Sequence, residues 1–143
     1  MIGRMRWGLA VILAGVAGCG AVRSIISSGS QTTIRLVNAA DYPVAVELYY
    51  GDTQETLAAV LQETGTQVVR RLAAGEEASI SRKCDALQAV MIEEAGMDVA
   101  VGLGPNDNTG VFSDGSDFNC GDTIVFTFTN MGVTELNITV SVE

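Results

Sequence analysis

The side chains able to carry chemistry in this chain are mainly carboxylates and cysteines, because its 143 residues include no histidine. Ser-His-Asp and Cys-His catalysis are therefore excluded. The absence of histidine and of a CxxC pair also argues strongly against a zinc site. The hydrolase elbow GxSxG and the phosphate loop GxxxxGK(S/T) are absent. Glu76-Glu77 and Glu93-Glu94 are adjacent carboxylates, but neighbouring strand residues point to opposite faces. We therefore assign no catalytic residue and keep a carboxylate hydrolase only as the last alternative.

Oxygen-bearing side chains gather between residues 104 and 122. Ca²⁺ takes six to eight oxygen ligands in flexible geometry, so this stretch has suitable chemistry. The candidate ligands are Asp107, Asp114, Asp117 and Asp122, accompanied by Asn106, Asn108 and Asn119. The spacing is not that of an EF-hand and no glutamate closes the loop. The same residue types are common in ordinary turns, so a plain loop is the competing interpretation, and we predict no other cofactor.

Three tyrosines offer a further surface for recognition. Tyr42, Tyr49 and Tyr50 lie close together in the sequence, and tyrosine is enriched at protein interfaces. Tyr50 alternates in step with Val46 and Leu48, which predicts a core position, whereas Tyr49 is expected beside Glu47 on the outer face. A protein or glycan patch around Tyr49 competes with an ordinary strand surface.

The first 20 residues have the organisation of an export signal. Arg4 and Arg6 precede an apolar run over residues 7–16 that contains no charge. The run is too short for a comfortable transmembrane helix, which needs about 20 residues. A basic start, a short apolar segment and small residues before a cut site are typical of a secretory signal peptide.

Val16-Ala17-Gly18-Cys19 ends this run, and an aliphatic residue, two small ones and a cysteine resemble the lipobox of bacterial lipoproteins. The resemblance implies cleavage of residues 1–18, a diacylglycerol on the Cys19 thiol and acylation of the new amino group, with palmitate as the expected fatty acid. Two or more acyl chains give stable membrane anchoring. Gly20, in place of an aspartate, implies the outer rather than the inner membrane. The alternative is an ordinary cysteine in a signal that is simply removed.

Cys84 and Cys120 remain once Cys19 carries lipid. An even pair of cysteines in an exported chain indicates a disulfide, because that compartment is oxidising. Two free thiols, or half of a metal site, are the competing interpretations.

The mature chain is strongly acidic. All 17 acidic residues follow the cut, whereas two of the eight basic ones are lost with the signal, so six oppose 17 and the net charge is −11. Nucleic-acid binding is excluded on this ground, since phosphate contacts need clustered Lys and Arg. We expect residues 19–32 to form the lipidated cysteine with a flexible tether, and residues 33–143 to form one domain.

Apolar residues alternate with polar ones along most of that domain, which is typical of half-buried strands. The stretches 34–39 and 44–50 predict a hairpin or neighbouring strands of a sandwich. Residues 67–72 and 78–82 flank a turn and predict a second hairpin. The apolar runs 89–92 and 99–103 are separated by an expected glycine turn within 93–97, and 104–122 is the longest expected loop. The strongest alternation covers residues 124–128 and 136–142.

One stretch, 52–63, has a helical pattern. Asp52 and Glu55 have the spacing of a capping box, Leu57, Val60 and Leu61 share a face, and Gly65 follows. Another strand pair is the alternative.

About eight or nine short strands with one helix predict an all-β fold, an antiparallel β-sandwich. The stretch IRLVNAADYPVAVELYY is similar to the first hairpin of small exported bacterial β-domains, which favours an immunoglobulin-like sandwich over a barrel. The functional expectation is a cell-envelope interaction or structural module held to the membrane by lipid. A calcium-dependent adhesion or ligand-binding module is the alternative.

Overall fold

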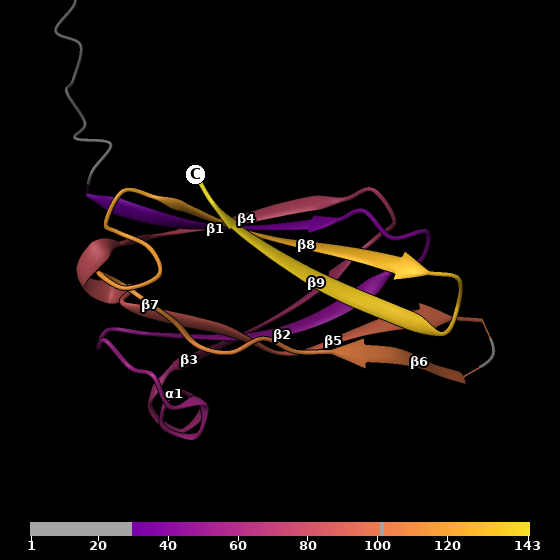
Figure 1. The fold of residues 1–143 in the computed structure, drawn as a ribbon, viewed down its shortest axis with the longest axis horizontal. Coiled ribbons are helices and arrows are strands. Elements are labelled where there is room, and N and C mark those ends of the chain that lie inside the picture. The colour runs from indigo at the N-terminus through magenta and orange to yellow at the C-terminus, as the bar shows by residue number, and fades with distance from the viewer. Residues whose placement is uncertain (1–29, 101) are drawn as a thin grey trace, which may run out of the picture.

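Two β-sheets pack face to face in the computed structural model, which describes residues 30–100 and 102–143 (Figure 1). The first sheet has the order β4 (Glu77–Lys83), β1 (Gln31–Asn38), β8 (Thr123–Met131), β9 (Glu135–Val142). The second has the order β3 (Thr66–Leu72), β2 (Val44–Gly51), β5 (Ala89–Val99), β6 (Gly102–Asp107), with β7 (Phe112–Ser113) also paired to β5. All pairings are antiparallel except β1 with β8, which is parallel. The predicted β-sandwich is confirmed.

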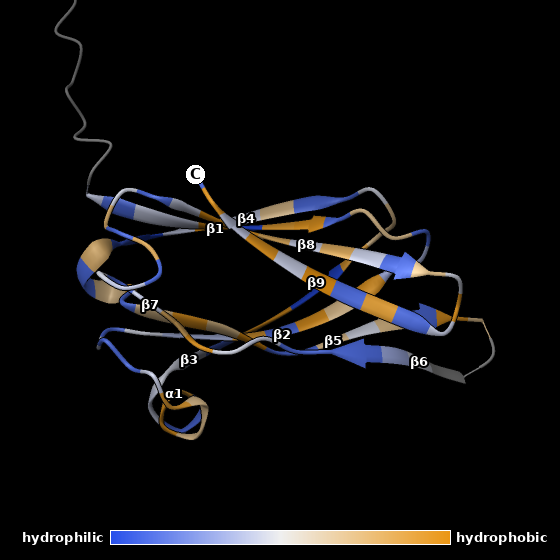
Figure 2. Cartoon of the chain, in the orientation of Figure 1, coloured by the Kyte–Doolittle hydropathy of each residue, from blue (hydrophilic) through white to orange (hydrophobic). Residues whose placement is uncertain are grey.

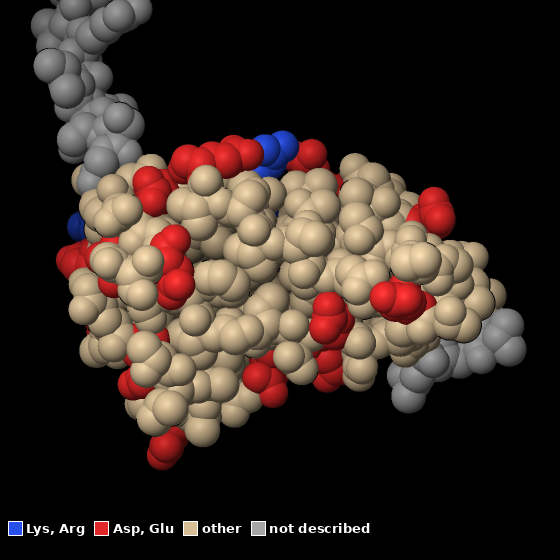
Figure 3. Space-filling model, viewed as in Figure 1, with Lys and Arg blue, Asp and Glu red and all other residues tan. Residues whose placement is uncertain are grey.

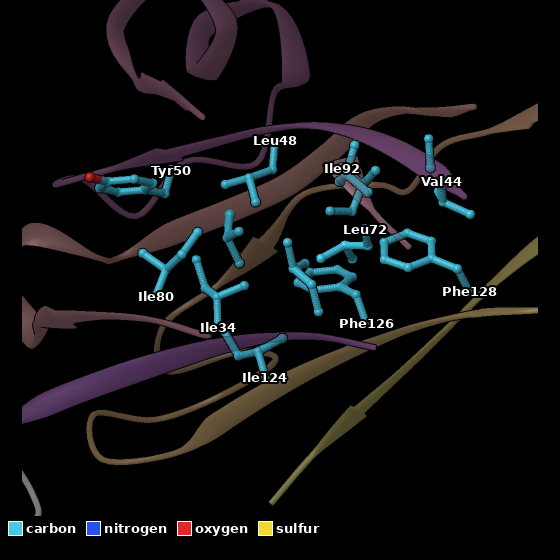
Figure 4. Close-up of a cluster of buried hydrophobic side chains, with 14 of the residues drawn as sticks. Ile34, Val44, Leu48, Tyr50, Leu72, Ile80, Ile92, Ile124, Phe126 and Phe128 are labelled. Atoms are coloured by element: carbon cyan, nitrogen blue, oxygen red, sulfur yellow. The ribbon is translucent and has the colours of Figure 1, made fainter. Parts of the chain in front are cut away.

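The core lies between the sheets and follows the alternation in the sequence. Ile34 and Leu36 of β1 are fully buried, as are Phe126 and Phe128 of the neighbouring β8. They face an apolar row of β2, namely Val44, Val46, Leu48 and Tyr50 (Figure 4). Colouring by hydropathy shows the same alternation of apolar and polar positions along the strands (Figure 2). Burial of these side chains supplies the main driving force for folding.

The predicted second hairpin is wrong, because β3 and β4 belong to opposite sheets. The same is true of β1 and β2, so the sandwich alternative holds for that pair. The buried side chain of Asn38 explains both crossings. Its Nδ2 lies 2.9 Å from the carbonyl of Tyr42 in the first crossing, and 3.1 and 3.0 Å from those of Leu72 and Ala73 in the second.

Asn38→Ala should lower the free energy of unfolding by about 1 to 3 kcal/mol, because buried carbonyls at both crossings lose their donor. Urea denaturation checks this, with Asn137→Ala as the control. Asn137 is only partly buried and its amide donates to the exposed Glu135 carboxylate, so a change below about 0.5 kcal/mol is expected. Equal losses in the two variants would contradict the role given to Asn38.

The expected glycine turn within residues 93–97 is also wrong, because β5 continues unbroken from Ala89 to Val99. Ile92 pairs with Leu48 and Glu94 with Glu47, so Glu93 forms a β-bulge that absorbs the shift in register. The expected loop 104–122 likewise contains β7 and the end of β6.

The predicted helix forms, but later than expected, as α1 (Ala58–Thr64) between β2 and β3. Leu57, not Asp52, occupies the N-cap position and supplies no side-chain cap. The Glu55 carboxylate instead accepts hydrogen bonds from the backbone of Leu57 and Thr56, which holds its pKa below the ordinary value. Leu61 anchors α1 on the outer face of the second sheet against Ala89 and Met91.

Candidate functional site

The predicted disulfide is present, with the Cα atoms of Cys84 and Cys120 5.3 Å apart. Cys84 opens a 3-10 turn, η1 (Cys84–Ala86), directly after β4, and Cys120 lies shortly before β8. Because β4 and β8 are the two neighbours of β1, the bond links the strands on both sides of β1. The backbone of Cys84 also donates to the carbonyl of Ser30, where β1 begins. The disulfide therefore closes the end of the sandwich at which the chain enters.

The predicted lipid site, Cys19, lies outside the described residues, as do the signal peptide 1–18 and most of the expected tether 19–32. β1 begins at Gln31, and Thr32 is fully buried, so the sandwich includes two residues that the sequence pattern assigns to the tether. Within residues 30–100 and 102–143, no helix has the length and apolar character needed to cross a bilayer.

Three of the four candidate calcium ligands accept hydrogen bonds from backbone N–H groups in the structure. Asp107 Oδ2 accepts from the backbone of Ile138 in β9, at 3.0 Å. Asp117 accepts from Ser113 and Asp122 from Asn119, each within its own turn, while Asp114 forms a β-bridge with Phe118. In the described part of the chain, no three Asp, Glu or Cys side chains are grouped so that they could hold a metal ion.

One member of each adjacent carboxylate pair lies opposite a side chain of a neighbouring strand. Glu77 of β4 pairs with Arg35 of β1, with 2.6 Å between Oε2 and Nη2, which raises the pKa of the arginine. Glu94 faces Glu47 across the β2–β5 ladder, a like-charge pair on the solvent side.

Tyr49 and Tyr50 point to opposite faces, as the alternation predicts. Tyr50 is in the core, whereas Tyr49 is half-buried on the outer face and its hydroxyl donates to Glu47 Oε1 at 2.9 Å. Gln67 Nε2 of β3 donates to the same oxygen at 2.6 Å. The hydrogen bond to Glu47 raises the pKa of Tyr49 above its ordinary value, because the neutral phenol is the donor.

We expect the Tyr49 phenol to ionise above pH 10.0, and Glu47→Gln to bring its pKa back toward that value. The stabilisation from this hydrogen bond is complete below the unfolded pKa and is lost as pH rises through the folded one. Phenolate absorbance, compared between the native chain and Tyr49→Phe, isolates this titration. An unchanged Tyr49 pKa in Glu47→Gln would show that the bond does not set it.

A cavity of about 370 Å³ lies at one end of the sandwich, and residues of both sheets form its walls. Its walls come from the end of β2, the start of β3 and the end of β4, and they include Tyr50, Asp52, Thr66 and Arg82. Arg82 Nε donates to the Tyr50 hydroxyl at 2.9 Å, and the guanidinium carbon lies 5.4 Å from the ring centroid. This contact joins the two sheets across the opening.

Arg82 is not among the residues predicted from the sequence, although the sequence contains a signal for it. Arg82 follows Ile80 at the spacing of inward-facing strand residues, and it pairs with the buried Thr32. A cation in that alternating position indicates a side chain that covers the end of the core.

No protein-family model matches the chain, and no curated protein matches its sequence. Among solved structures, the lipoprotein TssJ1 of the type VI secretion system (T6SS) from Pseudomonas aeruginosa is similar over 79% of this chain and 97% of that one, with 15% identity and a TM-score of 0.42. The membrane-binding domain of pneumolysin has 11% identity and a TM-score of 0.44 over the same shares.

A protein from Eubacterium rectale has 11% identity and a TM-score of 0.43, over 81% of this chain and 91% of that one. Each of these TM-scores is below 0.5 and no identity exceeds 15%, so these similarities assign no function to the chain.

Proposed function

We propose that this chain is an exported, lipid-anchored protein of the bacterial cell envelope, and that its acidic sandwich is an interaction or structural module. The observation that carries the proposal is the order Val16-Ala17-Gly18-Cys19 after a basic and apolar leader. Cysteine usage supports it. The chain has three cysteines, and Cys84 and Cys120 are bonded to each other, which leaves Cys19 as the thiol available for lipid.

The fold suits a domain held from its N-terminal side. β1 starts where the chain enters, and the C-terminal Glu143 pairs by its backbone with Thr123 at that same end (Figure 1). The crossing loops and the β8–β9 turn lie at the far end of β1. An anchored sandwich would therefore present those loops, its edge strands and its sheet faces away from the bilayer. Gly20 in place of an aspartate supports outer-membrane placement.

Metabolic labelling with an alkyne fatty acid tests the anchor. The native chain should incorporate the label and fractionate with membranes, while Cys19→Ala should lose both properties because the acceptor thiol is gone. The matched control is the double variant Cys84→Ala/Cys120→Ala, which removes two cysteines but leaves the proposed acceptor and should remain labelled. Labelling that persists in Cys19→Ala would overturn the proposal.

A further inference from the structure

The two open sides of the sandwich differ in how they are closed. On one side, β6 and β9 approach each other, and Ile138 of β9 donates its backbone N–H to Asp107 at the end of β6. On the other side, β3 and β4 are the terminal strands of their sheets within the described residues. β3 and β4 are similarly exposed: each has one buried residue, Leu72 on β3 and Ile80 on β4, and Val69 of β3 is 59% exposed.

Positive charge is concentrated on this β3–β4 side. The described residues include all 17 acidic side chains but only five basic ones, and four of these five are Arg70 and Arg71 on β3 and Arg82 and Lys83 on β4. On the face shown in Figure 3, acidic side chains far outnumber basic ones among the charged residues. β3 carries two arginines and no acid over its whole length. An overall acidic protein thus has two edge strands of net positive charge on one side, and β3 is the one without an acid.

The two arginines of β3 differ in what they contact. Arg71 is paired with Asp98 of β5, with 2.5 Å between Nη1 and Oδ2. Arg70 is exposed, and its Nη1 donates only to the backbone carbonyl of the adjacent Val69. Among residues 30–100 and 102–143, neither Arg70 nor Lys83 takes part in a salt bridge. Their charge is therefore available to an anionic partner.

We propose that β3 receives an extended, acidic segment of another protein, which adds to the second sheet as a new strand beside β3. The free edge of a terminal strand offers backbone N–H and C=O groups to such a segment. Carboxylates of the segment would meet Arg70, and an apolar side chain would cover Val69. The inference deepens the proposed function, on which it rests, by assigning the partner-binding surface of the envelope module.

Charge disfavours the other occupants of this edge. A second copy paired through its own β3 would bring two more arginines and no carboxylate to this edge, so it lacks the charge complementarity of an acidic segment. Edge cations in β-proteins also deter unwanted strand pairing. If Arg70 and Arg71 only prevent strand pairing, no peptide should bind to β3. If β3 is a binding edge, an acidic peptide should bind.

The test uses the mature lipidated chain in detergent micelles and a fluorescent, capped peptide of alternating glutamate and valine, matched to the seven residues of β3. Fluorescence anisotropy should show saturable binding, and the same peptide with lysine in place of glutamate should not bind. Arg70→Glu should weaken binding about tenfold or more. Arg35→Glu, which makes the same charge change on β1, should leave the affinity within about twofold.

Backbone methylation separates strand addition from charge attraction alone. Alternate backbone N–H groups of an extended peptide point to its two opposite edges. We therefore use two versions of the peptide, one methylated on the odd-numbered amides and one on the even-numbered amides. The version that lacks the N–H donors facing β3 should fail to bind. Binding that survives both methylations, or that is equal for the lysine peptide, would overturn the proposal. The proposal would also be overturned if no peptide bound, or if the chain associated with itself through β3. Binding of anionic phosphatidylglycerol vesicles, instead of the peptide, through Arg70 would overturn it as well. Loss of peptide binding in a chain that is still labelled at Cys19 would refute this inference without touching the anchor.

Discussion

Replacing Cys84 and Cys120 by serine should lower the free energy of unfolding by about 3 to 4 kcal/mol. The bond spans 36 residues, and releasing a loop of that size returns this much conformational entropy to the unfolded chain. The structure adds a local effect. Because the disulfide joins both neighbours of β1, its loss should loosen the N-terminal half of β1 more than the distal crossings.

Urea denaturation of the double serine variant measures the loss in stability, and amide hydrogen exchange locates it. Thr33 is a suitable reporter, since its backbone N–H donates to the carbonyl of Asp122 at 3.0 Å, close to the bond. The distal reporter is Ala39, whose N–H donates to Phe128. Uniform acceleration of exchange at both amides would show that the disulfide acts only through the unfolded state.

Phe126→Ala should be as damaging, with a loss of about 3 to 5 kcal/mol, because a fully buried aromatic side chain leaves a cavity behind. Phe126 lies on β8, opposite Leu36 of β1, and its ring meets that of Phe112 edge to face with centroids 5.9 Å apart. Removing it therefore affects the centre of the first sheet and the short strand β7 together.

The control for this variant is Val142→Ala. Val142 shares the alternating pattern of β9 but is 41% exposed, so its truncation should cost less than about 1 kcal/mol. Thermal or urea unfolding of both variants gives the comparison. A loss below about 1.5 kcal/mol for Phe126→Ala would contradict the packing described, since large buried side chains cost more than this on truncation.

The faces of the strands could be predicted from the sequence because they depend on a local period. Ile34, Leu36, Phe126 and Phe128 are buried as their alternation indicates, and Tyr49 and Tyr50 point to opposite faces. The disulfide was predictable for a different reason. Once the leader indicates export and Cys19 is assigned to lipid, two cysteines remain in an oxidising compartment.

The partner of each strand could not be predicted, because periodicity specifies a face and not a neighbour. β3 and β4 resemble a hairpin locally, yet Asn38 holds the turn between them in a crossing from one sheet to the other. Gly96 suggested a turn, but it lies within β5 opposite Ala45, and no atom lies within 4 Å of where its side chain would begin. The helix began late because residues 52–57 cross from β2 to the outer face first.

In the candidate site, too, some features could be predicted from the sequence and others depend on how the chain folds. The cysteines were found through their number and compartment, which are properties of the sequence. The cavity beside Arg82 and the joint basic side of β3 and β4 arise from segments brought together by the crossings, such as Tyr50 with Arg82, 32 positions apart. The loop aspartates form a group in the sequence, whereas in the structure Asp107, Asp117 and Asp122 accept hydrogen bonds from three different backbone N–H groups, those of Ile138, Ser113 and Asn119.

Mass spectrometry of the native protein, extracted from membranes without reduction, tests the central claim most directly. Our account predicts an N-terminal peptide that begins at Cys19 and carries the mass of a diacylglycerol and a fatty acid, together with a peptide pair joined through Cys84 and Cys120. A chain that retains residues 1–18, with an unmodified Cys19 thiol, would contradict it.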